Sequence, residues 1–154
     1  MKLLYLMRHG HSPSTQESGA ASDASRPLSD KGLRDAAHVA RELAARGARP
    51  SLVLHSPLTR AAQTAAVVAA ALGLAPETLK ALDNTLAADK AFAALRARAD
   101  AVEEVLAVGH QPQVGELVAF LTDEAFEFRP AGAAAVALEP TPRLLWAFNA
   151  DELG

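Results

Sequence analysis

The sequence predicts a three-layer α/β/α fold, in which helices cover both faces of a mainly parallel β-sheet. Short apolar runs of strand length alternate along the chain with longer segments whose apolar residues recur at helical spacing. A parallel sheet built from such units is covered on both faces. The chain has 154 residues, 50% of them hydrophobic, which is about the size of one domain with one core. No repeat or linker divides it, so we expect residues 1–154 to form a single domain.

A long loop separates the first predicted strand from the first predicted helix. Residues 3–7 form an apolar run that is too short for a helix, and they predict a central strand. Residues 12–29 are rich in Ser, Ala, Gly and Asp, as is typical of a loop, and a loop of this length suggests a functional role. From Leu33 to Ala44 the apolar side chains follow a helical stripe that Gly47 closes, so this segment predicts an amphipathic helix with Leu33 on its buried face.

The second strand and the second helix are expected to follow one another directly. Residues 52–54 form another short apolar run of strand length. Ser56 is a good N-cap, and Pro57 suits the first position of a helix, so we expect the helix to begin there. Its apolar stripe runs through residues 58–72 and ends at Gly73.

The remaining elements repeat this rhythm and finish with two strands. A turn containing Pro140 and Pro142 separates these last two strands. The expected elements are a strand at 77–82, a helix at 90–98 with Phe92 and Leu95 facing inward, a strand at 104–109, a helix after Pro112, and strands at 133–138 and 144–148.

Composition and charge exclude several classes of protein. The chain has 15 Lys and Arg against 18 Asp and Glu, a net charge of −3, which does not suit a nucleic-acid-binding or membrane-surface protein. The lack of cysteine excludes disulfides, thiolate zinc sites and cysteine nucleophiles. The apolar run after Lys2 stops at Arg8, far short of a signal peptide or a membrane span. We therefore expect a cytoplasmic protein.

Basic side chains and histidines gather where the predicted strands end. Arg8 and His9 follow the first strand, Arg60 lies just beyond the second, and His110 follows the strand at 104–109. Because ligands of parallel sheets bind outside the carboxyl ends of the strands, these residues are expected to converge on one pocket. Arg60 would lie in the first turn of a helix, where a cation is disfavoured unless an anion accompanies it. The complementary ligand is a multiply charged oxyanion, most simply a phosphoryl group.

Four segments resemble motifs of the histidine phosphatase (phosphoglycerate mutase-like) superfamily. The small size and the lack of an inserted cap are similar to the SixA-type phosphohistidine phosphatases. The resemblance implies a phosphoglycerate mutase-like fold and a phosphatase activity. The segments, in the order of the family, are residues 6–11, 26–32, 56–65 and 108–112.

The resemblance implies a role for each matching residue. His9 would be the nucleophile that accepts the phosphoryl group, and Arg8, Arg60 and His110 would bind its equatorial oxygens. Arg26, in the long loop, matches a position that can reach the pocket. In-line displacement requires an unprotonated imidazole nitrogen on one side of phosphorus and cationic donors around the equator. No cofactor is implied, and no carboxylates cluster with these histidines to bind a metal.

One departure from the family concerns the acid that protonates the leaving group. Phosphomonoesterases and mutases of the superfamily usually supply a Glu or Asp after the third strand, whereas residues 79–86 hold only Asp83. An alkoxide leaves poorly without an acid, but the nitrogen of a phosphohistidine can be protonated by solvent. This difference favours a phosphohistidine-bearing protein as substrate. The resemblance implies a histidine-containing phosphotransfer domain as the partner. We expect the enzyme to be a monomer.

Two alternatives stay open. The chain could be a small-molecule phosphomonoesterase that uses Asp83 or substrate-assisted protonation, or a non-catalytic module that binds phosphate or phosphoprotein. A mutase is disfavoured because no cap segment would retain an intermediate.

Other polar and aromatic residues are expected to have ordinary structural roles. His11 and His55 adjoin the motifs and would lie at the rim of the pocket or stabilise the fold, while His38 would be solvated on its helix. Glu116 suits the first turn of a helix as a solvated carboxylate. Packing is expected of the aromatic residues Phe126, Phe128, Trp146 and Phe148.

Overall fold

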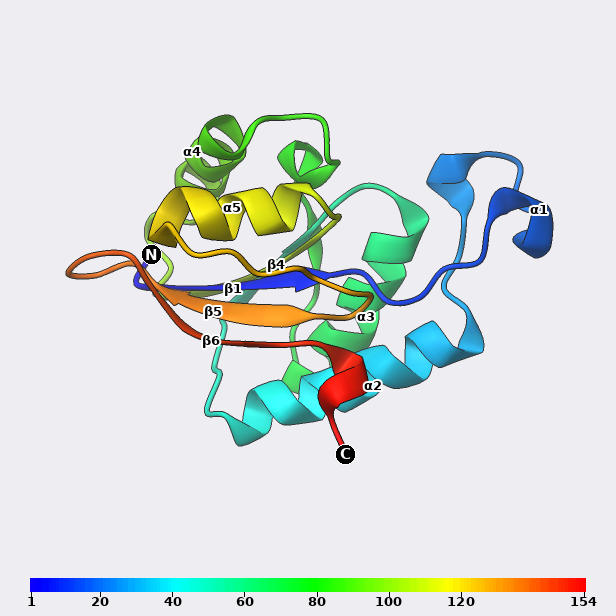
Figure 1. Ribbon diagram of the computed structural model, residues 1–154, viewed down its shortest axis with the longest axis horizontal. Helices are drawn as coiled ribbons and strands as arrows, with labels where there is room; N and C mark the ends of the chain where they lie inside the picture. Colours follow the sequence, from blue (N-terminus) through cyan, green and yellow to red (C-terminus); the bar gives the residue numbers. More distant parts are fainter.

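A computed structural model describes all residues, 1–154, and confirms the three-layer architecture (Figure 1). The sheet has the strand order β3-β2-β4-β1-β5-β6. The first four strands in this order are parallel, β5 is antiparallel to β1, and β6 is antiparallel to β5. The strands are β1 (Leu3–Arg8), β2 (Leu52–His55), β3 (Glu77–Thr78), β4 (Glu104–Gly109), β5 (Ala133–Ala137) and β6 (Arg143–Phe148).

Helices form the outer two layers. In Figure 1, α4 and α5 cover one face of the sheet, and α2 and α3 cover the other. The α-helices are α1 (Thr15–Ser18), α2 (Asp30–Ala45), α3 (Thr59–Leu72), α4 (Ala88–Ala99) and α5 (Gln113–Thr122). Three short 3₁₀ turns complete the chain, namely η1 (Asp23–Ser25), η2 (Lys80–Leu82) and η3 (Ala150–Glu152).

The central strand β1 is apolar throughout because both of its faces are buried. Leu4 and Leu6 belong to the core beneath α4 and α5, whereas Tyr5 and Met7 belong to the core beneath α2 and α3. Successive side chains of a strand point to opposite faces, so a strand between two helical layers needs an unbroken apolar sequence. Arg8, the last residue of β1, lies at the carboxyl edge of the sheet.

The helix after β2 begins later than the sequence predicts. Ser56 is not the N-cap of α3, because the helix starts at Thr59 with Leu58 in the N-cap position. The Ser56 hydroxyl instead accepts a hydrogen bond from the Leu58 backbone nitrogen (3.2 Å) and lies 2.7 Å from Nε2 of His110. The contact with His110 comes from a distant part of the chain, so the local pattern could not reveal it.

The predicted strand at 77–82 is also shorter in the structure. Only Glu77 and Thr78 pair with β2, after which the chain turns into η2. Leu82 at the end of this turn is fully buried in the core beneath α4 and α5. The apolar residues of this segment therefore fill the core from a turn and not from an edge strand.

The prediction for Leu33 was wrong. Leu33 is 41% exposed, and the buried face of α2 begins at Gly32. A Cβ atom on Gly32 would lie 2.3 Å from the His11 carbonyl oxygen, so the helix approaches the backbone after β1 as closely as a glycine permits. This contact turns Gly32 inward and Leu33 outward.

The loop at 12–29 contains more structure than the sequence predicts. It holds the four-residue helix α1, which Ser14 and Glu17 cap reciprocally, and the turn η1. No helix in the structure is long and apolar enough to cross a membrane. The cytoplasmic location and the monomeric state stay predictions.

Candidate active site

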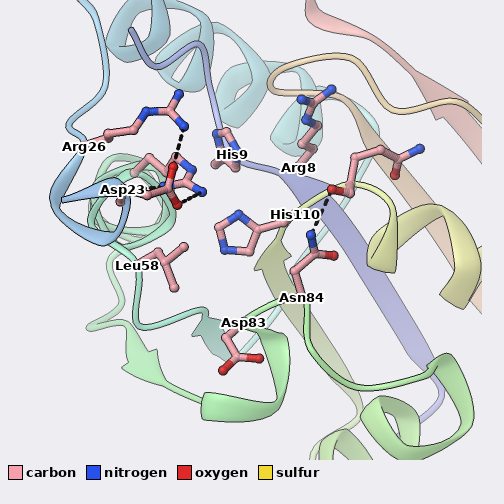
Figure 2. Close-up of a pocket in the computed structure, with 10 residues that line it drawn as sticks. Arg8, His9, Asp23, Arg26, Leu58, Asp83, Asn84 and His110 are labelled. Carbon is pink, nitrogen blue, oxygen red and sulfur yellow. Dashed lines mark hydrogen bonds and ion pairs between the residues drawn. The ribbon is translucent and has the colours of Figure 1, made fainter. Parts of the chain in front are cut away.

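A cavity of about 360 Å³ opens where β1, β2 and β4 end (Figure 2). The predicted convergence is confirmed, because the residues that follow these separate strands face one another across this cavity. Leu58 is the one hydrophobic residue in its lining. The site residues singled out from the sequence that line the cavity are Arg8, His9, Arg26, Arg60, Asp83 and His110.

His9 lies at the end of β1 and is 8% exposed. Its Nδ1 is 2.7 Å from the carbonyl oxygen of Gly10. A carbonyl oxygen can only accept, so Nδ1 carries the hydrogen and Nε2 keeps a free lone pair. Burial, followed by the charges of His110, Arg60 and Arg8, lowers the pKa of His9 to about 3. The ring is therefore neutral at physiological pH.

Gly10 allows the chain to leave β1 in close contact with two helices. A Cβ atom at this position would lie 2.8 Å from the carbonyl oxygen of Gly32 in α2. The Gly10 backbone nitrogen donates to Oγ1 of Thr64 (3.0 Å), which donates in turn to the carbonyl oxygen of Arg60 (2.8 Å). These contacts fix the residue after His9 against the first turn of α3.

Arg8 and His110 lie beside His9. Arg8 Nη1 donates to the carbonyl oxygen of Phe128 (2.8 Å), while its buried Nε has no partner. The ring of His110 is centred 5.1 Å from that of His9. Burial, followed by the charge of Arg60, lowers the pKa of His110 to about 4, so it is also neutral at physiological pH.

His110 forms a hydrogen bond with Ser56. The Ser56 hydroxyl accepts a hydrogen bond from the Leu58 backbone nitrogen and lies 2.7 Å from Nε2 of His110, and the tautomer of His110 decides which of these two atoms donates. A neutral imidazole that accepts at Nε2 carries its hydrogen on Nδ1. His110 can then offer an N–H group to an oxygen of a ligand.

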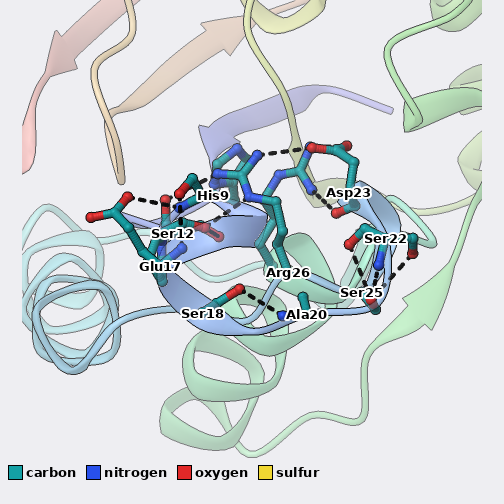
Figure 3. Close-up of polar contacts among 12 residues, drawn as sticks. His9, Ser12, Glu17, Ser18, Ala20, Ser22, Asp23, Ser25 and Arg26 are labelled. Carbon is teal, nitrogen blue, oxygen red and sulfur yellow. Dashed lines mark hydrogen bonds and ion pairs between the residues drawn. The ribbon is translucent and has the colours of Figure 1, made fainter.

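Arg60 is paired with an anion of the protein itself. Asp23 of η1 forms ion pairs with Arg60 and with Arg26, and Figure 3 shows the latter beside it. Arg60 donates to the Asp23 carbonyl oxygen (2.9 Å) and lies 3.2 Å from carboxylate Oδ2, and Arg26 Nη1 lies 2.9 Å from Oδ1. The hydrogen bond from Arg26 is the main cause that lowers the pKa of Asp23. The position of Arg60 in the first turn of a helix predicts an anion beside it, and in this structure that anion is the carboxylate of Asp23.

Arg26 also binds its own loop. Its Nε donates to the carbonyl oxygen of Pro13 (2.8 Å) and its Nη2 to that of Ser12 (3.0 Å). The guanidinium group therefore holds the loop 12–26 together while it lines the cavity. Its predicted contact with a phosphoryl group stays a prediction.

Asp83 and Asn84 line the cavity from the turn after η2 (Figure 2). One carboxylate oxygen of Asp83 accepts hydrogen bonds from the backbone and the hydroxyl of Thr85, at 3.1 and 2.5 Å. Asn84 donates to the Gln111 carbonyl oxygen (3.1 Å) and accepts from the Gln113 backbone nitrogen (3.1 Å). Asn84 thus attaches this turn to the start of α5.

The sequence analysis missed several residues of the cavity, and the two histidines that it expected at the rim or in a structural role lie outside the lining. Asp23 lies in a loop without a recognised motif, and its spacing of three residues from Arg26 was the one available signal. His11 is exposed and bonded to Ser29, and buried His55 is bonded to the Ser56 carbonyl oxygen, both outside the cavity lining. The residues in the lining that sequence reasoning missed are Asp23, Leu58, Asn84 and Gln111.

The charges in the cavity determine which ligand it can take. Three arginines and two histidines line it, against two carboxylates, one of which is held by the arginines. No cluster of three or more His, Asp or Glu side chains suited to a metal ion is present. A neutral imidazole with a free lone pair, surrounded by guanidinium groups, is suited to phosphoryl transfer.

Comparison with known proteins gives the family. Residues 4–89, more than half of the chain, match the model of the histidine phosphatase superfamily (branch 1), and the chain belongs to this family. An uncharacterised protein from Picosynechococcus sp. (strain ATCC 27264 / PCC 7002 / PR-6) is 38% identical over 116 residues, which are 73% of this chain and 68% of that protein.

Two solved structures show the same fold. The protein histidine phosphatase SixA complexed with tungstate matches with a TM-score of 0.88 and 30% identity, over 99% of both chains. A phosphoserine phosphatase mutant from Entamoeba histolytica in complex with phosphoserine matches with a TM-score of 0.75 and 13% identity, over 100% of both chains. The family match and the SixA similarity make this chain a SixA-like phosphatase.

Proposed function

We propose that the protein hydrolyses phosphohistidine in a protein partner through a covalent phosphohistidine intermediate on His9. The observation that supports this most directly is the state of the carboxylates around the cavity. Asp23 is ionised between Arg26 and Arg60, and one oxygen of Asp83 is occupied by Thr85. If Asp83, bonded to Thr85, does not protonate the leaving group, a nitrogen leaving group is favoured, because solvent can protonate it.

The proposed reaction has two displacements. Nε2 of His9 attacks phosphorus, the N–P bond of the partner breaks, and its electron pair stays on the partner's imidazole nitrogen, which takes a proton from solvent. Arg8, Arg60 and His110 bind the equatorial oxygens, whose charge increases in the transition state. A water molecule then attacks the phosphoryl group on His9, which releases inorganic phosphate and restores the lone pair.

A trapping experiment tests the nucleophile. The wild-type protein is incubated briefly with a ³²P-labelled phosphohistidine protein and quenched without acid. The expected label on the enzyme is stable to alkali and labile to acid, as an N–P bond is. His9→Ala should lose the label and lower turnover by about 1,000-fold or more, whereas the matched control His38→Ala should retain both. A label that remains on His9→Ala would overturn the assignment.

The second candidate is a small-molecule phosphomonoesterase. The position of Asp83 in the cavity lining favours it, since a carboxylic acid there could protonate an alkoxide. Turnover of a phosphohistidine protein and of a panel of alkyl and aryl phosphates should be measured with wild type and Asp83→Asn. If Asp83 is that acid, its loss should cost about 100- to 10,000-fold on alkyl phosphates and little on aryl phosphates with good leaving groups.

The proposal expects Asp83→Asn to change phosphohistidine turnover by less than about 3-fold, below the range of a positioned acid. Asp89→Asn, an exposed change on α4, is the matched control. Efficient wild-type turnover of alkyl esters that depends on Asp83 would establish the second candidate instead. The family and its structural neighbours favour either enzyme over a non-catalytic binding module. A histidine-containing phosphotransfer domain is the proposed partner.

A further inference from the structure

A second groove, of about 310 Å³, lies next to the catalytic cavity. One wall is the first half of α5, and the other is the segment 125–127, through which the chain returns from α5 toward β5. Most of the lining is small or apolar, including Gly115, Ala119, Ala125 and Phe126. The two charged residues in the lining are Glu116 and Glu127.

The groove and the catalytic cavity are neighbours at two points. Gln111 lines both of them. The segment 125–127 leads directly to Phe128, whose carbonyl oxygen accepts the hydrogen bond from Arg8. Figure 1 shows this stretch running back along α5 toward the carboxyl end of β1. If the phosphoryl group of a ligand reaches His9, the neighbouring part of that ligand would therefore lie beside the groove.

The two sites carry charges of opposite sign. The catalytic cavity is lined by Arg8, Arg26 and Arg60, whereas the charged residues of the groove are both carboxylates. Neither Glu116 nor Glu127 takes part in any of the ion pairs of the structure. The whole segment 111–128 contains four Asp and Glu and no Lys, Arg or His. The complementary ligand has an anionic group next to a cationic one.

We infer that the groove binds an arginine or lysine side chain of the partner polypeptide, next to its phosphohistidine. This inference rests on the proposed function and specifies the substrate class. The aliphatic stem of such a side chain would contact Ala119 and Phe126, while its charged head would lie near Glu116 and Glu127. The groove is at the lower end of the range of about 300–1,000 Å³ for ligand sites, which suits one long side chain.

The inference separates polypeptide substrates from small ones. Free phosphohistidine and aryl phosphates have no side chain to place in the groove, so they would use the catalytic cavity alone. Charge in the groove should therefore change the reaction of a peptide and leave that of a small substrate unaltered.

The test uses two synthetic peptides phosphorylated on a single histidine with phosphoramidate. The histidine is flanked on both sides by arginines in one peptide and by glutamates in the other. Wild-type protein should hydrolyse the arginine peptide with a kcat/KM about 3- to 30-fold above that of the glutamate peptide, as expected for two exposed charge pairs. The preference should decrease at 0.5 M NaCl, since salt screens exposed charges.

Glu116→Lys combined with Glu127→Lys should abolish or invert this preference. The change should occur in KM, with kcat within about 2-fold, because the groove does not contact the reacting atoms. The matched control is Glu103→Lys combined with Glu139→Lys, two exposed glutamates near the opposite end of the strands, which alters the net charge of the protein equally. Both double variants should hydrolyse free phosphohistidine at the wild-type rate.

The outcomes distinguish this inference from the proposed function. Equal hydrolysis of the two peptides by wild type, or a preference that survives in the groove variant, would overturn the groove assignment alone. A preference lost equally in the control variant would attribute it to net charge and also overturn the assignment. No hydrolysis of either peptide or of free phosphohistidine, with esters still hydrolysed, would overturn the proposed function and this substrate class with it.

Discussion

His9 can act as a nucleophile only while its imidazole is neutral, and two features of the residue ensure this. The Gly10 carbonyl oxygen holds the hydrogen on Nδ1, and burial together with nearby cations lowers the pKa to about 3. The motif could single out His9 as the candidate nucleophile, because the end of the strand and the type of residue can both be recognised from the local sequence. It could not predict the tautomer, which depends on how the backbone turns after β1.

The depressed pKa values of His9 and His110 predict that acid destabilises the fold. Both imidazoles titrate near 6.5 when unfolded but near 3 and 4 when folded, so between these values the unfolded state binds more protons. The free energy of unfolding is highest above pH 6.5 and falls as the pH is lowered toward 4. At pH 5 the loss is about 2 kcal/mol for each histidine.

Urea unfolding at pH 7.5 and pH 5 measures this loss. His110→Gln should reduce the difference between the two pH values by about 1–2 kcal/mol, whereas the control His38→Gln should leave it unchanged. A pH dependence identical in wild type and His110→Gln would contradict the buried neutral state of His110.

Asp23 occupies the guanidinium group of Arg60, to which the proposed function assigns the binding of the phosphoryl group. A tetrahedral oxyanion must compete with the Asp23 carboxylate for Arg60, and the two negative charges repel each other across the cavity. Asp23→Asn keeps the size and the hydrogen-bonding capacity of the side chain but removes the charge. We expect tungstate to bind about 3- to 30-fold more tightly to this variant, as measured by calorimetry.

The control for this experiment is Asp123→Asn, since Asp123 lies outside the cavity in a left-handed conformation that asparagine also adopts. Weaker binding to Asp23→Asn would show instead that the carboxylate mainly holds Arg26 and Arg60 in place.

At the scale of elements, the sequence predicted the helices and strands that a local pattern specifies. It missed the features that depend on contacts with distant parts of the chain. The strands β1, β2 and β4 are short apolar runs, and their interpretation was correct. The start of α3 was wrong because the hydroxyl of Ser56 is used by His110, 54 residues away. The orientation of α2 was wrong because Gly32, with no side chain to indicate burial, faces the backbone of His11.

The contact at Gly32 leads to a prediction for the packing of α2. Gly32→Ala places a Cβ atom against the His11 carbonyl oxygen, and backbone cannot yield as a flexible side chain does. The free energy of unfolding should fall by about 1–3 kcal/mol, as for other overpacked sites. Because the same backbone precedes the loop of Arg26, tungstate affinity should fall as well. Leu33→Ala, the exposed neighbour, should change stability by less than about 1 kcal/mol.

At the scale of the whole molecule, three strands, one loop and one turn assemble a cationic cavity in a protein of net charge −3. The order of strands in the sheet places the ends of β2, β4 and β1 side by side, which explains why residues from three parts of the sequence meet. Sequence reasoning could predict this edge from the rule for parallel sheets. It could not predict the loop that brings Asp23 over Arg60, since no regular pattern specifies a loop of that length.

This charge distribution predicts how the enzyme responds to metal removal and to oxyanions. A divalent cation would enter a cavity whose three guanidinium groups repel it, whereas tungstate or vanadate presents the oxygens that these groups bind. Activity toward a phosphohistidine protein should therefore be unchanged after dialysis against 10 mM EDTA. Vanadate should inhibit competitively, because its five-coordinate form resembles the transition state. Arg60→Gln should weaken vanadate inhibition by about 10-fold or more, since it removes a charged hydrogen bond, whereas Arg143→Gln at the opposite end of the sheet should not. Loss of activity in EDTA that one divalent metal restores would show that catalysis at this site depends on a metal.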